Sequence, residues 1–293
     1  MSLVKLYKNG SYKTQINLET GTRYYFGDTG SPDFPDSIDL KITEWCPWGC
    51  PFCYESSGTS GRHSYTSKLL SVLSELPKVP LEIAIGGGSA PDHPDFRIIK
   101  EFVTGRGNIA NLTVTQRDLG RLNPEVFEGI SGLGVSVGSG LVIDPKTEIP
   151  GPKQVVYHVI AGITPVSNIQ KLVESSQKIL VLGYKNLGRA KTDALPNLKE
   201  TESYLKQVIR RNPTRATLVF DELSIQQLQI RKAVIESTWK MLYQGPEFSH
   251  SMFLDAVTGE YFPSSSTDRT SGVSWDSMKI TEYFKKYHVR DSY

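Results

Sequence analysis

The chain has 293 residues, of which 38% are hydrophobic and 22% are charged, a composition typical of a globular protein with one large domain or two small ones. Its 33 Lys and Arg nearly balance its 31 Asp and Glu, which argues against a dedicated nucleic-acid binder. No apolar run approaches the roughly 20 residues that span a bilayer, and residues 1–10 lack the apolar core of a signal peptide. We therefore expect a cytoplasmic protein without membrane contact.

Residues 1–36 predict a small β-rich N-terminal extension. Turn signals at residues 8–10 (KNG) and 20–21 (TG) separate short strand-like runs. The stretch 27–36 is rich in Pro, Gly and Asp, as linkers are, so the first domain boundary is expected there.

From residue 37 onward, short strand-like runs alternate with amphipathic helix-like runs. The expected strands are residues 38–43, 81–86, 112–115, 133–137, 155–160, 179–183 and 216–220. The expected helices are residues 66–76, 95–104, 124–130, 168–177 and 198–210. This alternation predicts βα units around a parallel sheet. We expect an α/β fold with a partial (β/α)6-type barrel over residues 37–222, whose working end lies at the carboxyl ends of the strands.

Residues 223–293 predict a mixed C-terminal extension. A long helix is expected at 224–242, a hairpin at 252–262 and a last helix near 275–288. The polar residues 264–272 between the hairpin and the last helix are expected to form a loop.

All three cysteines lie in the segment CPWGCPFC, as Cys46, Cys50 and Cys53. This segment follows the first strand of the α/β region, so the thiols are expected on a loop at that strand's carboxyl end. Three clustered cysteines do not make a disulfide scaffold, and thiolates are the ligands that iron–sulfur clusters require. A four-iron cluster held by three cysteines would keep one iron open to an exogenous ligand.

The C-x3-C-x2-C spacing on such a loop resembles the radical S-adenosylmethionine (SAM) superfamily, and the resemblance covers roughly residues 38–220. It implies that the three cysteines hold a 4Fe–4S cluster whose open iron binds the amino and carboxylate groups of SAM. It also implies an external electron donor of the flavodoxin or ferredoxin type. One electron cleaves SAM, and the resulting 5′-deoxyadenosyl radical abstracts a hydrogen atom from the substrate.

The same resemblance implies a set of SAM contacts. The candidates are Phe52, Gly86, Gly87, Gly88, Ser89, Ser136 and Tyr184. Residues 86–89 (GGGS) stand where the family commonly carries a Gly-Gly-Glu type motif whose backbone holds the SAM amino group, and Ser89 replaces the acidic residue that is frequent there. Phe52 matches an aromatic position beside the adenine. Ser136 is expected to reach the ribose or the carboxylate, and Tyr184 to line the adenine edge.

Plainer interpretations of several of these residues stay open. A structural zinc site could combine the cysteines with His63 as a fourth ligand. His158 lies in an expected strand, where it could be structural or catalytic. Lys185, Arg189 and Lys191 follow the sixth strand, where they could meet an anionic substrate group or belong to a solvated loop.

The cysteine count narrows the class of reaction. One cluster uses all three thiols, so neither an auxiliary cluster nor a methyl-carrying cysteine can be built. We therefore expect a radical SAM enzyme that acts directly on a small molecule or a nucleotide, with its catalytic side chains not identified by the sequence. The alternatives are an activating enzyme that installs a radical on a partner protein, and a non-catalytic protein that binds zinc or an iron–sulfur cluster.

Overall fold

The computed structural model describes residues 3–28, 30–139, 154–191, 197–211, 215–243 and 245–288, together with residues 144, 149, 152 and 195. Most of residues 140–153, between the fourth and fifth expected strands, thus lie outside the described residues. Within the described residues, no helix is both long enough and apolar enough to cross a bilayer.

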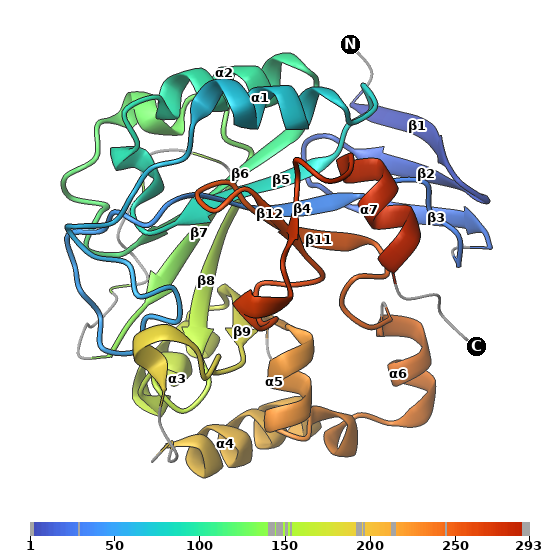
Figure 1. The fold of residues 1–293 in the computed structure, drawn as a ribbon. Helices are drawn as coiled ribbons and strands as arrows, with labels where there is room; N and C mark the ends of the chain where they lie inside the picture. Colours follow the sequence, from blue (N-terminus) through green and yellow to red (C-terminus); the bar gives the residue numbers. More distant parts are fainter. Residues whose placement is uncertain are drawn as a thin grey trace.

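A large central sheet contains all seven strands that the sequence predicts (Figure 1). They are β4 (Ser37–Thr43), β5 (Glu82–Gly87), β6 (Ile109–Thr115), β7 (Gly132–Val137), β8 (Gln154–Ile160), β9 (Lys178–Leu182) and β10 (Thr217–Phe220). Each pairs in parallel with the next one along the chain. The expected α/β fold is therefore confirmed.

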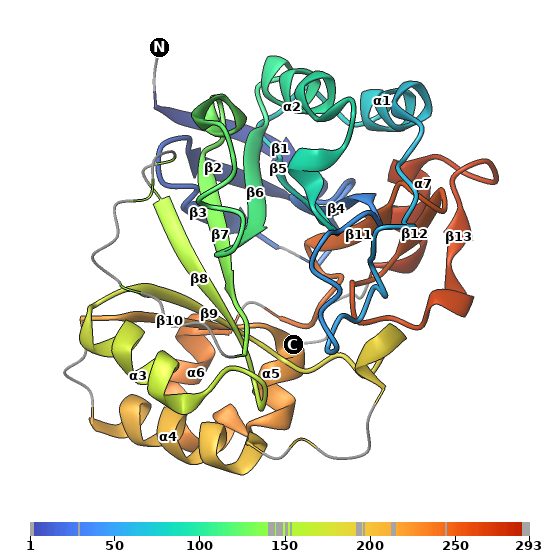
Figure 2. The same ribbon diagram turned by 90° about the vertical axis from the view of Figure 1, so that its left-hand side faces the viewer.

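In the described part of the chain, α-helices follow five of these strands and cover one side of the sheet. They are α1 (Thr66–Ser74), α2 (Phe96–Gly105), α3 (Val166–Glu174), α4 (Leu198–Arg211) and α5 (Glu222–Gln227). Because crossovers between parallel strands are right-handed, strands added in one direction put their helices on the same face. Figure 2 shows α1 and α2 outside β5 and β6, and α3 and α4 outside β9 and β10. The partial (β/α)6-type barrel itself stays a prediction.

The C-terminal extension adds to the central sheet. The hairpin predicted at 252–262 is confirmed as β11 (Ser251–Asp255) and β12 (Glu260–Phe262), followed by β13 (Val273–Ser274). Strand β11 pairs in parallel with β4, so the full sheet has the order β10-β9-β8-β7-β6-β5-β4-β11-β12-β13. Pairing with β4 joins residues more than 200 positions apart, which local patterning does not reveal.

Several predicted helices were wrong in extent. Residues 124–130 form only a short 3-10 turn, η2 (Pro124–Phe127), and Gly129 then takes a left-handed backbone with φ +75°. The predicted helix 224–242 is broken after α5. Gln229 is left-handed (φ 50°), and such a residue cannot continue a right-handed helix.

The remaining C-terminal segments are short. After the break come the 3-10 turn η4 (Ile230–Ala233) and α6 (Glu236–Leu242). The last helix, α7 (Ile280–Tyr287), begins later than the predicted 275 because β13 and a turn occupy the residues before it. Helix α7 is anchored by the buried side chains Tyr283 and Phe284.

The N-terminal extension forms a separate antiparallel sheet of β1 (Val4–Asn9), β2 (Tyr12–Asn17) and β3 (Arg23–Gly27). Both predicted turns are present, with left-handed glycines at Gly10 and Gly21. The buried carboxylate of Asp36 joins this sheet to the start of β4. It accepts hydrogen bonds from the hydroxyls of Tyr7 (2.8 Å) and Tyr12 (2.7 Å).

Candidate functional site

The cysteines lie on residues 44–65, the loop between β4 and α1, as the sequence predicts. The base of this loop is folded back on itself by backbone hydrogen bonds. The Glu44 N–H donates to the Arg62 carbonyl at 2.8 Å, and the Cys46 N–H donates to the Gly58 carbonyl at 3.0 Å. This pairing holds the first cysteine rigidly at the end of β4.

The three thiols are free and partly shielded from water. Cys46 is buried, whereas Cys50 and Cys53 are half-buried. Burial raises the pKa of the Cys46 thiol, and neighbouring negative charge at Cys50 and Cys53 raises it further. Burial also raises the pKa of the Cys50 thiol, against the opposing charge of Arg117. Three thiolates near enough to repel one another are a donor set that a bound cation would stabilise, which fits an iron–sulfur cluster.

A single metal ion finds less support in this loop. Among the residues that the structure describes, no three His, Cys, Asp or Glu side chains are arranged to hold one metal ion. His63, the expected fourth ligand of a zinc site, instead lies with its Nδ1 2.9 Å from the Thr43 hydroxyl and its ring 5.0 Å from that of His93. In a four-iron cluster each cysteine binds a different iron. The sulfur ligands therefore lie farther apart than they would around a single metal ion.

The glycine-rich turn after β5 lies directly against the cysteine loop. The Gly88 N–H donates to the Thr43 carbonyl at 2.8 Å, and the Ser89 N–H donates to the Trp45 carbonyl at 2.7 Å. A Cβ on Gly88 would lie 2.2 Å from the Trp45 carbonyl oxygen, and one on Gly87 would lie 2.4 Å from the Thr43 oxygen. A Cβ on Gly86 would meet nothing within 4 Å. Two of the glycines thus permit the close approach, while the third borders open space.

The Ser89 side chain is held by a neighbouring arginine. Its buried hydroxyl accepts a hydrogen bond from Arg121 at 2.9 Å. Arg121 in turn forms ion pairs with Asp92 (2.5 Å) and Asp118 (2.7 Å). Asp118 also accepts a hydrogen bond from the Trp48 indole at 2.9 Å, which anchors the cysteine loop from a third side.

The other predicted SAM contacts lie at the same end of the sheet but in different surroundings. Phe52 is half-buried, and its ring tip would be 3.5 Å from a Cβ on Gly138, just after β7. Ser136 is half-buried on β7. Tyr184 is buried, and its hydroxyl donates to the carbonyl of Ala190. Their contacts with SAM stay predictions.

The sheet face opposite the helices is polar. Alternate strand residues on this inner face are Asp39, Asn111, Thr113, Ser136 and His158, all at least partly accessible to water. Sequence analysis missed Asp39, although the alternation of apolar and polar residues in IDLKIT carried the signal, because alternate residues of a strand point to opposite faces.

Charged groups on this inner face have shifted acidities. Burial raises the pKa of Asp39 to about 6, and the Lys185 ammonium opposes the shift. Burial lowers the pKa of His158 to about 4, and Lys185 lowers it further. Asp39 is exposed to water, although other protein groups crowd around its carboxylate. Lys185 lies over the Tyr54 ring, 4.3 Å from its centroid. Lys185 therefore connects the inner face with the residue that follows Cys53.

A second charge cluster joins β4 and the cysteine loop to the C-terminal extension. The Lys41 ammonium on β4 lies 2.7 Å from Glu55 of the cysteine loop and 2.8 Å from Asp255 of β11. Arg269 forms a further ion pair with Glu55 and lies 4.6 Å from the ring centroid of Phe253. The extension thus helps to fix the cysteine loop, a role that the sequence does not reveal.

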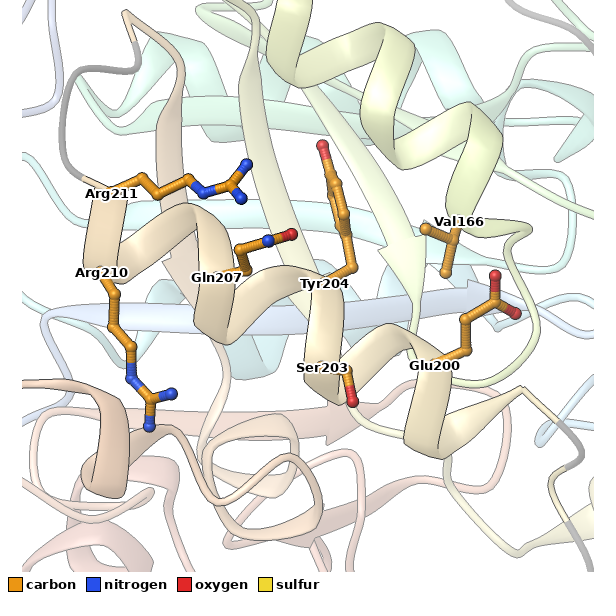
Figure 3. A pocket seen from close by; sticks show the side chains of 7 residues that line it. All are labelled: Val166, Glu200, Ser203, Tyr204, Gln207, Arg210 and Arg211. Atoms are coloured by element: carbon orange, nitrogen blue, oxygen red, sulfur yellow. The ribbon is translucent and has the colours of Figure 1, made fainter.

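A different hollow lies on the outside of the molecule. Figure 3 shows Tyr204, Glu200 and Val166 around it, on α4 and at the start of α3. It is lined by residues of the helical layer and by none of the cysteine loop. We therefore assign no part of the candidate site to it.

No protein-family model matches the sequence, and no curated protein is significantly similar to it. Solved structures do match. The chain shares its fold with SuiB of Streptococcus suis. The crystal structure of SuiB bound to S-adenosylmethionine has a TM-score of 0.65 and 10% sequence identity, and the match covers 97% of this chain and 87% of SuiB. SuiB without a stated ligand matches over the same shares with a TM-score of 0.62 and 10% identity.

A third SuiB structure is bound to the precursor peptide SuiA. It has a TM-score of 0.62 and 11% identity, over 88% of this chain and 66% of SuiB. At such identities the likeness to SuiB shows the fold alone. That fold extends over both the N-terminal and the C-terminal extension, which the sequence resemblance did not cover.

Proposed function

We propose that the protein is a radical SAM enzyme in which Cys46, Cys50 and Cys53 hold a 4Fe–4S cluster beside SAM. The observation that carries this proposal is the backbone pairing of the cysteine loop with the glycine turn, through the Ser89 N–H and the Trp45 carbonyl. The cysteine loop resembles the cluster loop of the radical SAM superfamily, and the glycine turn resembles its SAM-binding turn. The two lie beside each other at one end of the sheet. SuiB, which shares the fold, has been crystallised with SAM, and this supports the same ligand.

When bound, the cluster would supply the electron that cleaves SAM to the 5′-deoxyadenosyl radical. The residues of this chain would bind SAM and orient it. Three thiolates would bind three of the four irons and leave the fourth iron for SAM. Gly86 would let the backbone approach the amino group of SAM. The Phe52 ring is available to the adenine, Ser136 to the ribose or carboxylate, and the ring edge of Tyr184 to the adenine. An external donor of the flavodoxin or ferredoxin type would supply the electron.

The polar inner face is the proposed substrate site. Holding the substrate there, on a partial (β/α)6-type barrel, would orient its reacting hydrogen toward the SAM carbon and limit access of water. Asp39 and His158 are accessible on this face to contact it. Lys185 lies beside them, with its ammonium hydrogen-bonded to the Ser265 hydroxyl. A small molecule or nucleotide is favoured by the cysteine count, which leaves no thiol for an auxiliary cluster.

A peptide is the second candidate substrate. It is favoured by the SuiB structure that is bound to its precursor peptide. Deuterium-labelled candidates of both kinds can be compared by the transfer of deuterium into 5′-deoxyadenosine, because only the true hydrogen donor passes its label to that product.

The test of the proposed function is anaerobic reconstitution with iron and sulfide, followed by SAM and a reductant. We expect about four irons per chain and formation of 5′-deoxyadenosine, measured by mass spectrometry. Cys50→Ala should lose both. Ser60→Ala, an exposed change in the same loop, is the matched control and should retain both. Tight binding of one zinc with no 5′-deoxyadenosine would instead support the non-catalytic alternative.

A further inference from the structure

The segment that follows β9 docks on the cysteine loop through one side chain. Arg189 lies in the 3-10 turn η3 (Gly188–Ala190). Its guanidinium donates to the carbonyl of Cys50 at 3.2 Å, of Ser56 at 2.7 Å and of Ser57 at 2.6 Å. Its backbone N–H donates to the carbonyl of Cys53 at 3.1 Å. One residue thus contacts two of the three cysteines and the turn after them.

The turn η3 is itself held in close contact with the loop. Gly188 is left-handed (φ 55°), and a Cβ there would lie 2.4 Å from the Tyr54 carbonyl oxygen. On the other side, the Tyr184 hydroxyl donates to the Ala190 carbonyl. Arg189 is therefore presented to the loop from a fixed backbone.

The cysteine loop has few means to hold this shape by itself. Between Cys50 and Ser56 its backbone pairing consists of two short turns, Cys53 N–H to Cys50 carbonyl and Ser56 N–H to Cys53 carbonyl, each at 3.2 Å. Gly49 is left-handed and has no neighbour that a Cβ would meet within 4 Å. The planar guanidinium of arginine carries several N–H donors in fixed directions, so it can hold several carbonyl groups of such a segment at once. The ammonium group of lysine lacks this forked arrangement of donors.

We propose that Arg189 is a positioning residue, which fixes the cysteine loop in the shape that binds the cluster. The cluster site is then built by residues 188–190 as well as by the β4–α1 loop. This inference rests on the proposed function. It also assigns Arg189 a role other than the anionic substrate contact considered from the sequence, because the guanidinium is already bound to three carbonyls.

The first measurement uses the protein without a cluster, by hydrogen–deuterium exchange of the amides in residues 46–57. Arg189→Gln removes both the positive charge and the forked N–H donors of the guanidinium. Arg189→Lys retains the positive charge but removes the forked donors. Both should exchange at least about tenfold faster than wild type, the factor that corresponds to roughly 1.4 kcal/mol, or one lost charge-assisted hydrogen bond. Lys191→Gln, an exposed change on the same segment, is the control and should match wild type. Unchanged exchange in β4–β6 would show that the variants fold.

The second measurement follows loss of iron from the reconstituted proteins to a chelator, with the paramagnetic spectrum of the reduced cluster. Both Arg189 variants should release iron at least about tenfold faster than wild type and Lys191→Gln. If the amide exchange, the iron release and the spectrum of Arg189→Gln all match those of wild type, the inference is overturned. If wild type binds no cluster but the loop exchanges faster in both variants, the proposed function fails, and only the hold of Arg189 on the loop stands.

Discussion

The glycine turn allows one structural contact and one ligand contact to be tested separately. Gly88→Ala would put a Cβ 2.2 Å from the Trp45 carbonyl oxygen, so the turn and the cysteine loop must move apart. Such overpacking costs about 1–3 kcal/mol, and each kcal/mol lowers the melting temperature by about 2–4 °C in a domain of this size. Gly86→Ala meets nothing within 4 Å and should leave the melting temperature unchanged.

The two variants should separate SAM affinity from stability. Gly86→Ala should lose affinity, whereas Gly88→Ala should lose stability. The methyl group of Gly86→Ala extends into the open space proposed for SAM, so we expect at least about tenfold weaker SAM binding with normal stability. Calorimetric titration of the reconstituted protein with SAM and thermal unfolding of the cluster-free protein measure the two effects. Wild-type SAM affinity in Gly86→Ala would refute the proposed ligand contact. Wild-type stability in Gly88→Ala would refute the close approach of the loops.

Three further predictions concern titrating groups. Hydrogen bonds and the Arg23 charge outweigh burial and hold the pKa of Asp36 below its usual value, so Asp36 adds stability above about pH 4 that is lost as the pH falls. Asp36→Asn should cost about 2–4 kcal/mol at pH 7 in urea unfolding, and the cost should shrink in acid. The pKa of Asp39 is raised to about 6, so wild type should lose stability as the pH rises from 4 to 6, and Asp39→Asn should lose less. His158, with a pKa of about 4, should stay neutral down to pH 5 in a nuclear magnetic resonance titration, whereas a midpoint near 6.5 would contradict its burial.

Local patterning was sufficient for the strands of the α/β region and for the position of the cysteine loop. Strand-like runs such as IDLKIT are recognisable because alternate residues face opposite sides of a sheet. The helix boundaries were less predictable, since the break at Gln229 depends on a left-handed backbone that its residue type does not demand. The pairing of β11 with β4 was not predictable either, because it joins segments far apart in the chain.

The amino-acid sequence alone predicted the kind of chemistry, because three thiols at fixed spacing after a strand restrict the ligands that the loop can bind. Tertiary structure decided which distant groups complete that loop. The guanidinium of Arg189 joins the loop to the segment after β9, and the Lys41 ion pairs join it to β11. The close contact of Gly88 with Trp45 joins it to the end of β5. These contacts depend on hydrogen-bond distances of about 3 Å, which only a folded backbone can establish between remote residues.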